Sequence, residues 1–78
     1  MGNPFNNEIV LKYKISNSQK IYVQLFNIAG SLIRKEEYAA TAGTGIYTIS
    51  GFQQLNSGVY LLKIETGGDQ QTIRLVKN

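Results

Sequence analysis

Carboxylates are the side chains of this sequence that come nearest to catalytic chemistry. The chain of 78 residues contains Glu8, Glu36, Glu37, Glu65 and Asp69, of which only Glu36 and Glu37 are adjacent. Successive residues of a β-strand point to opposite faces, so these two carboxylates cannot easily act together on one substrate. We interpret the pair as a solvated strand end.

Nucleophiles and soft metal ligands are missing from the composition. The sequence has no histidine and no cysteine, which removes imidazole bases, thiolate nucleophiles, disulfides and the usual zinc ligands. A serine nucleophile would then need an activated lysine, and no Ser-x-x-Lys spacing occurs. Ser57-Gly58 lacks the second glycine of a nucleophile elbow, so we interpret Gly58 as a conformational residue. The sequence predicts no catalytic residue and no enzymatic activity.

Ligand-binding chemistry is equally sparse. Asp69 follows Gly67-Gly68 and offers one hard oxygen ligand, which falls far below a calcium-binding signature, so we interpret this segment as a turn. We expect no metal and no cofactor. Exposed aromatic rings on a flat sheet could bind sugars, although so small a domain needs such rings in its core, and packing is the preferred interpretation. The aromatic candidates are Tyr22, Phe26, Tyr38 and Tyr47.

The charge pattern is mildly basic. Eight Lys and Arg against five Asp and Glu give a net charge of +3, spread over several segments, so we expect no nucleic-acid partner. Lys63, Arg74 and Lys77 could form a basic stripe towards the C-terminus. Two interpretations of this stripe stay open, namely protection of an edge strand by charge and recognition of a partner.

Alternating apolar residues predict a strand and a hairpin in the first half of the chain. Glu8 to Ile15 alternates as a half-buried strand does. Ile21 to Phe26 repeats the alternation, and Asn27 to Gly30 turns the chain into Ser31 to Tyr38. Gly30 can adopt the positive φ that a tight hairpin needs. The face of the first strand that should be buried carries Ile9, Leu11, Tyr13 and Ile15.

The second half is less regular before it reaches another hairpin. Ala39 to Gly45 has Ala, Thr and Gly without apolar periodicity, and we interpret it as a loop that crosses the domain. Ile46 to Ser50 is a short strand, from which Gly51 to Ser57 leads over to the next. Gly58 to Thr66 and Gln71 to Lys77 then form the second hairpin around the glycine turn.

Six or seven short strands, regular turn signals and no convincing helix predict an all-β fold, an immunoglobulin-like antiparallel β-sandwich. A barrel is the weaker alternative. Ile73 to Val76 is expected at or near a sheet edge, and with Val59 to Ile64 it forms an apolar segment prone to pair with other chains. We therefore expect that the isolated domain can form a strand-exchanged homodimer.

The most strongly patterned segment runs from Leu55 to Ile64. Tyr60, Leu62 and Ile64 share one face at period two, so Tyr60 should be buried with its hydroxyl bound to a partner. In immunoglobulin-like sandwiches a tyrosine corner lies two residues before a core position, and Tyr60 stands two residues before Leu62.

Four motifs, in this order and at these spacings, resemble the type A C-terminal sorting domain of the type IX secretion system, the Por secretion system family. Asn3-Pro4-Phe5 resembles the opening element without its leading proline, and Val23 to Gly30 resembles the family's hairpin. Leu55 to Ile64 resembles its strongest motif, and Ile73 to Lys77 its terminal strand. We interpret residues 1–2 as a cloning remnant and residues 3–78 as a single C-terminal sorting domain.

The resemblance implies that the domain is a label for export. It would travel through the periplasm towards the outer-membrane surface or the extracellular medium and engage the type IX outer-membrane translocon. A sortase-like peptidase would then remove it from the N-terminal cargo domain, and the cargo would be attached to the surface or released. Residues expected to carry recognition by the translocon or the peptidase are Gly58, Tyr60, Lys63, Leu75, Val76 and Lys77.

Two other functions stay open at this point. An immunoglobulin- or fibronectin-like module of this size could bind sugars or proteins beside a secreted enzyme, because one fold serves many functions. A purely structural spacer beside a catalytic domain is the third interpretation. Removal of a spacer would lower stability and leave localisation unchanged.

Overall fold

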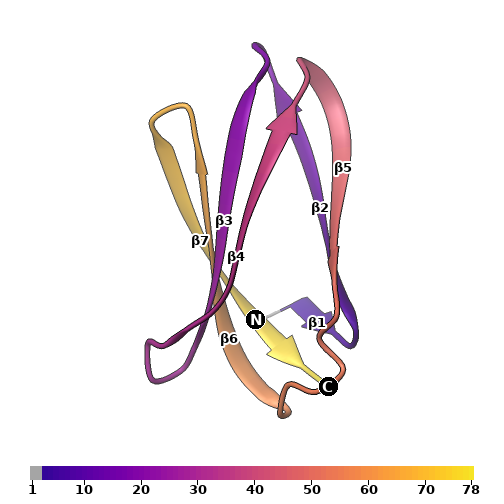
Figure 1. Cartoon of the computed structure of the whole chain (residues 1–78), viewed down its shortest axis with the longest axis vertical. Helices are drawn as coiled ribbons and strands as arrows, with labels where there is room; N and C mark the ends of the chain where they lie inside the picture. Colours follow the sequence, from indigo (N-terminus) through magenta and orange to yellow (C-terminus); the bar gives the residue numbers. More distant parts are fainter. Residues whose placement is uncertain (1–2) are drawn as a thin grey trace.

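The computed structural model describes residues 3–78, which form seven β-strands in two layers (Figure 1). Met1 and Gly2, which the sequence analysis assigned to a cloning remnant, lie outside the described residues. The strands are β1 (Asn3–Phe5), β2 (Glu8–Ile15), β3 (Gln19–Asn27), β4 (Leu32–Ala40), β5 (Gly43–Ser50), β6 (Gly58–Thr66) and β7 (Asp69–Lys77). Within residues 3–78 there is no helix that is long and apolar enough to cross a membrane.

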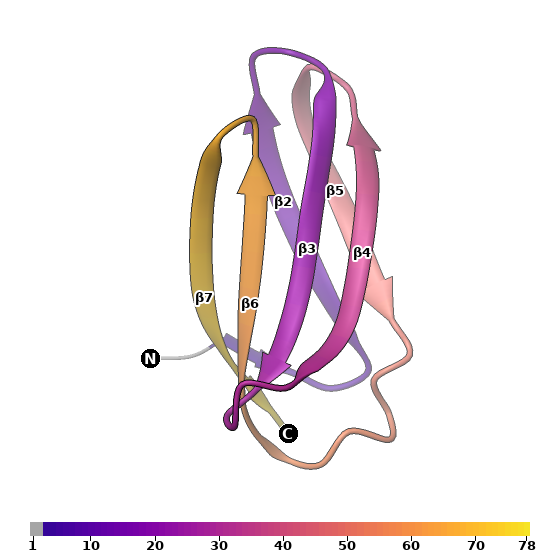
Figure 2. The same ribbon diagram turned by 60° about the vertical axis from the view of Figure 1, so that its left-hand side comes forward.

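The two layers are separate sheets. One has five strands in the order β1-β7-β6-β3-β4, and the other pairs β2 with β5. Every pair is antiparallel except β1 with β7, which is parallel. Two stacked sheets confirm the all-β sandwich and exclude the barrel, in which the strands would close into a single sheet. Figure 2 shows β2 and β5 behind the larger sheet.

Alternating side chains fill the space between the sheets. The four apolar residues predicted on the inner face of β2 line or contact the core, while the intervening residues of that strand are exposed or partly exposed. The core extends over both sheets and the segment between β5 and β6. Its buried apolar members are Phe5, Ile9, Ile21, Val23, Leu25, Ala40, Ile49, Phe52, Tyr60, Leu62 and Leu75.

Both predicted hairpins are confirmed. Gly30 adopts a φ of 90°, and its N–H donates to the carbonyl oxygen of Asn27 at 3.0 Å. The side-chain oxygen of Asn27 accepts from the N–H groups of Ala29 and Ser31, which stabilises the tight turn between β3 and β4. Gly67 and Gly68 both have positive φ and join β6 to β7.

The predicted loop from Ala39 to Gly45 is wrong. β4 continues to Ala40 and β5 begins at Gly43, so the connection between them is very short. Glycine is required at position 45 because a Cβ atom there would collide with the ring of Tyr13 on the neighbouring strand. Gly45 lies opposite Tyr13 in the β2–β5 pair, and the absence of a side chain lets the ring lie across the backbone.

The terminal strand has a different environment from an open edge. β7 lies between β6 and β1, so β1 is the strand at the border of the larger sheet. β1 covers β7 only from Leu75 to Lys77. The terminal segment Ile73 to Val76 was expected in an edge or near-edge strand, and the near-edge position is confirmed. The sequence analysis did not predict β1 as a strand.

Candidate recognition site

The β6–β7 hairpin and β1 bring together three of the four motifs singled out in the sequence. In the antiparallel register Gly58 lies opposite Lys77, and Tyr60 lies opposite Leu75. On the other side of β7, Phe5 of β1 lies opposite Lys77 in a parallel register. The N–H of Asn78 donates to the carbonyl oxygen of Phe5 at 3.0 Å and continues this ladder. The first and last strands thus form one unit.

The six residues expected to carry recognition do not share one surface. Tyr60, Leu75 and Lys77 are buried, with exposed fractions of 7%, 5% and 7%. Lys63 and Val76 lie on the alternating positions that face away from the core, and both are partly exposed. The remaining residue, Gly58, is exposed at the start of β6. Lys63 pairs with Thr72, well away from the Gly58–Lys77 end of the hairpin.

Tyr60 occupies a tyrosine corner, as the sequence pattern predicted. Its hydroxyl donates to the backbone carbonyl oxygen of Asn56, four residues upstream, at 2.8 Å. Its ring packs edge-on against Phe5, with 6.1 Å between the ring centroids. The buried hydroxyl thereby keeps a partner, and the ring connects the turn before β6 with β1.

Phe52 is the important core residue that sequence reasoning missed. It lies in the segment between β5 and β6, is 2% exposed, and packs edge-on against Phe5 at 5.7 Å between centroids. The N–H of Phe52 donates to the backbone oxygen of Asn7, which fixes the segment beside the β1–β2 connection. The segment that contains Phe52 has no apolar periodicity, so the hydrophobicity of this one residue was the only sign in the sequence that it is buried.

Lys77 is the one charged residue that is buried in the described part of the chain. Its ammonium group donates to the backbone oxygen of Asn78 at 3.1 Å. Because Lys77 faces inward while Lys63 and Arg74 face outward, the three cations do not form the basic stripe that the sequence suggested. Lys63 instead lies 3.7 Å from the carboxylate of Glu65 on the same outer face.

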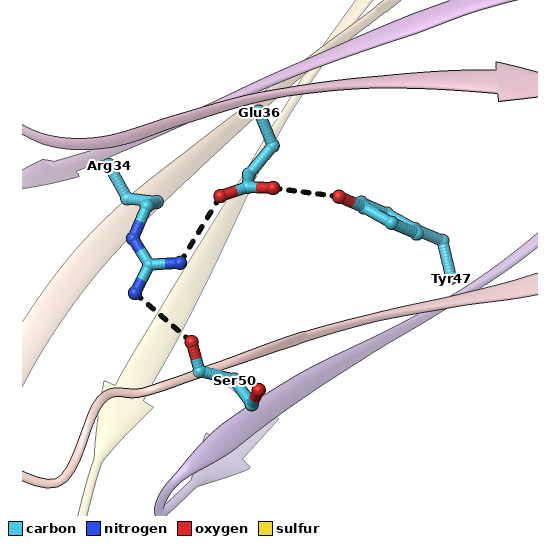
Figure 3. Close-up of polar contacts among 4 residues, drawn as sticks. All are labelled: Arg34, Glu36, Tyr47 and Ser50. Atoms are coloured by element: carbon cyan, nitrogen blue, oxygen red, sulfur yellow. Dashed lines mark hydrogen bonds and ion pairs between the residues drawn. The ribbon is translucent and has the colours of Figure 1, made fainter.

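On the opposite flank, polar side chains join β4 to β5 and hold the two sheets together (Figure 3). Arg34 donates from Nη1 to the Oε2 of Glu36 at 3.2 Å and from Nη2 to the carbonyl oxygen of Ser50 at 3.0 Å. The hydroxyl of Tyr47 donates to the Oε1 of Glu36 at 2.8 Å. The guanidinium also lies 4.9 Å from the centroid of the Phe52 ring.

Glu36 is therefore a bridging residue and not a solvated strand end. The prediction that Glu36 and Glu37 point to opposite faces is confirmed, and Glu37 fits the solvated interpretation, since its exposed carboxylate lies 3.6 Å from Lys20. Strand alternation directs Glu36 inward, where it meets a ring from the other sheet. Alternation alone could not identify that partner.

Three tyrosines in ring contact extend this connection between the sheets. The rings of Tyr38 and Tyr47 stack with centroids 4.3 Å apart, and Tyr13 packs edge-on against Tyr38 at 5.9 Å. The hydroxyl of Tyr13 donates to that of Tyr38 at 3.3 Å, and this bond raises the pKa of Tyr13. Packing against the core is thus confirmed for two of the four aromatic sugar-binding candidates, Tyr38 and Tyr47.

The Glu36 bridge predicts acid sensitivity. The bond from Tyr47 is the main cause that lowers the pKa of Glu36 below 4.5, and Arg34 adds to it. A carboxyl whose pKa is lower in the folded state contributes stability that is complete above its unfolded pKa and lost as the pH falls through the folded value. We expect the melting temperature to fall as the pH drops below about 4.5. This acid-induced fall should be smaller in Tyr47→Phe.

The alkaline limb has the opposite sign. Burial, followed by the bond to Glu36, raises the pKa of Tyr47 above 10.0, so its contribution is complete below that value and lost as the pH rises through the folded pKa. Thermal unfolding followed by circular dichroism over acid, neutral and alkaline buffers checks both limbs. Equal acid-induced losses in the wild type and in Tyr47→Phe would contradict the assignment to this bridge.

No cluster of three or more His, Cys, Asp or Glu residues that could hold a metal ion occurs within residues 3–78. A family model described as a secretion system C-terminal sorting domain matches residues 2–78. Comparisons with curated proteins and with solved structures found no match.

Proposed function

Since the chain belongs to the secretion system C-terminal sorting domain family, we propose that the β1–β7–β6 unit is the part engaged by the type IX outer-membrane translocon. The family makes the chain a C-terminal sorting signal of type IX secretion, attached to a cargo protein and destined for export across the outer membrane. We further propose transit through the periplasm as a folded domain, removal by a sortase-like peptidase, and surface attachment or release of the cargo.

The observation that carries this proposal is the agreement between the family match and the arrangement of the motifs. The match covers residues 2–78, and three motifs far apart in the sequence are adjacent strands of one sheet. A label that is read on many different cargoes has to keep its recognition features on its own fold. The β1–β7–β6 unit meets that requirement, because its contacts come from the domain itself.

The structure supports a division of roles among the six candidate residues. Tyr60, Leu75 and Lys77 are buried and would maintain the shape of the unit. Lys63 and Val76 face outward and would contact the translocon or the peptidase. Gly58 would set the entry into β6, since its φ of 149° lies in a region that favours glycine.

As a sorting signal, the domain is not itself expected to be catalytic. For the isolated domain, the strand-exchanged homodimer stays a prediction. It is supported by the unpaired outer edges of β2 and β5, because each of these strands pairs only with the other among the described residues.

The test is to fuse residues 3–78 behind a periplasm-targeted fluorescent cargo in a cell with a working type IX system. We expect the fusion to reach the cell surface or the medium, and the cargo without the domain to stay in the periplasm. A matched strain without the translocon should retain both. If the fusion and the bare cargo distribute alike in the competent cell, the sorting role fails for this chain, and a binding module becomes the better interpretation.

A further inference from the structure

A groove with a mixed but more apolar than polar lining opens between β2 and β7, on the flank opposite the Arg34–Glu36–Tyr47 bridge. It has a volume of about 880 Å³ and is lined on one side by the inner face of β2, with Leu11, Tyr13 and Ile15, and on the other by Ile73 and Gln71 of β7. Figure 1 shows the β6–β7 hairpin leaning away from β2. Leu11, Tyr13, Ile15 and Ile73 are only partly buried, so the core is incompletely covered here.

Two strands with free backbone groups border the groove. β2 pairs only with β5 among residues 3–78, which leaves its other edge without strand partners. Among residues 3–78, β1 covers β7 only at Leu75–Lys77, and no other described strand pairs with this edge from Asp69 to Arg74. At about 3.3 Å per residue, that open stretch is roughly 20 Å long, enough for one extended segment. Unpaired N–H and C=O groups along such an edge are a template for another strand.

The β1–β7 pairing is a precedent for how this edge is used. At one end of the groove, β1 adds its backbone to β7 and inserts Phe5 into the core, where it meets Phe52 and Tyr60. The open edge continues the same ladder beyond Leu75. An added segment would therefore extend an interface that the fold already contains, with the same alternation of inward and outward side chains.

We propose that the groove between β2 and β7 receives an extended segment of the export machinery, which pairs with Asp69–Arg74 and directs apolar side chains inward at every second residue. This rests on the proposed engagement by the translocon and names the surface and the chemistry of the partner. Hydrogen bonds between the backbones supply affinity that depends little on the sequence of the segment. The apolar lining favours segments with an apolar side chain at every second residue. The segment would cover Leu11, Ile15 and Ile73, which are only partly buried in the free domain.

Gln71 and Thr72 provide a matched pair for the test. Both are exposed neighbours on β7, but Gln71 lines the groove beside Ile73, whereas Thr72 faces away from the core. Gln71→Trp should fill the groove and Gln71→Lys should place a charge in it. Thr72→Trp adds the same bulk to the outer face. Circular dichroism melts establish that each variant folds, and the lysine variant serves if the tryptophan variant does not.

The probe is a phage-displayed library of random peptides of about nine residues, the length of β7, selected against the immobilised chain. We expect enrichment of peptides with apolar residues at alternate positions. Fluorescence anisotropy should then give binding about tenfold weaker for both Gln71 variants, a loss of about 1.4 kcal/mol. Thr72→Trp should weaken binding much less, because Thr72 pairs through its backbone alone and its side chain lies outside the groove. In cells, the Gln71 variants should also reduce surface delivery of the fused cargo.

Several results would overturn the proposal. One is enrichment of peptides that lack alternating apolar residues. Another is equal peptide binding by the Gln71 and Thr72 variants, and a third is normal secretion of the fused cargo by folded Gln71 variants. A wild-type chain found as a dimer by light scattering, with the dimer lost in Gln71→Trp, would assign the groove to a second copy. These failures are separate from failure of the sorting role, because the fusion of residues 3–78 can reach the surface while the groove binds nothing.

Discussion

Deletion of residues 75–78 should abolish surface delivery of a fused cargo and leave that cargo in the periplasm. The segment supplies every β7 partner of β1, since Asn3, Pro4 and Phe5 pair with Leu75, Val76 and Lys77. The deletion also removes Leu75, a core residue whose exposed fraction is 5%. Fractionation of cells that carry the intact and the truncated fusion measures the effect. Surface delivery of the truncated fusion at the intact level would contradict the proposed role of the β1–β7–β6 unit.

The deletion by itself does not separate loss of an address from loss of the fold, so two point variants are needed. Leu75→Ala removes a buried side chain, and we expect it to cost about 2–5 kcal/mol of unfolding free energy. Val76→Asp changes a partly exposed side chain on the outer face and should alter stability much less. If the outer face of β7 is read directly, the stable Val76 variant should still be retained in the periplasm.

A third variant keeps this comparison interpretable. Thr72→Asp introduces the same charge on the same outer face of β7, outside the Leu75–Lys77 stretch that β1 covers. Retention by both aspartate variants would indicate a general effect of charge on that face. Retention by Val76→Asp alone would place the contact at the covered end of the strand. Normal secretion of a folded Val76→Asp protein would remove Val76 from the recognition residues.

Local pattern was sufficient to predict the faces of the strands and the two hairpin turns. The alternation in Glu8–Ile15 assigned all four inner residues correctly, and the turns at Gly30 and at Gly67-Gly68 have the positive φ values that their glycines permit. The tyrosine corner was also predictable, because a tyrosine two residues before a core leucine places the hydroxyl near the preceding turn. In these cases residues close in sequence determine the geometry.

The features that were missed depend on partners far away in the sequence. β1 contains only three residues, one of them proline, and becomes a strand because β7 lies beside it more than seventy positions later. Ala39 to Gly45 lacks large apolar residues, yet most of it is strand, and Gly45 makes room for the ring of Tyr13. The loop was predicted there because strand prediction depends on alternating apolar residues. A glycine that is needed to make room for a ring on the neighbouring strand does not contribute to that pattern.

The same reasoning explains why the candidate site was only partly predictable. Sequence motifs identified β6 and β7 as the important hairpin but did not distinguish inward residues from outward ones at its end. Lys77 was assigned to a possible basic stripe with Lys63 and Arg74, whereas it occupies an inward position after Ile73 and Leu75. The groove between β2 and β7 could not be predicted at all, since it arises from how the two sheets diverge.

Phe52→Ala should be the most destabilising single substitution in the connecting segments, with a cost of about 3–5 kcal/mol. A single core in a domain of this size rarely supplies more than about 3–5 kcal/mol, so this substitution should unfold much of the population. Phe52 fills the space between Phe5 and Arg34. The centroid of its ring lies 5.7 Å from that of Phe5 and 4.9 Å from Cζ of Arg34. Its loss should therefore loosen β1 as well as the segment between β5 and β6.

Urea unfolding monitored by circular dichroism tests this expectation, with Ile28→Ala as the control because Ile28 is 75% exposed in the β3–β4 turn. The control should change the unfolding free energy by less than about 0.5 kcal/mol. Phe52→Leu, which keeps part of the buried volume, should lie between the two. Since Phe5 is held between Phe52 and Tyr60, loosening it should also impair the β1–β7 pairing and with it surface delivery. A Phe52→Ala protein as stable as the control would show that β1 is held without this ring.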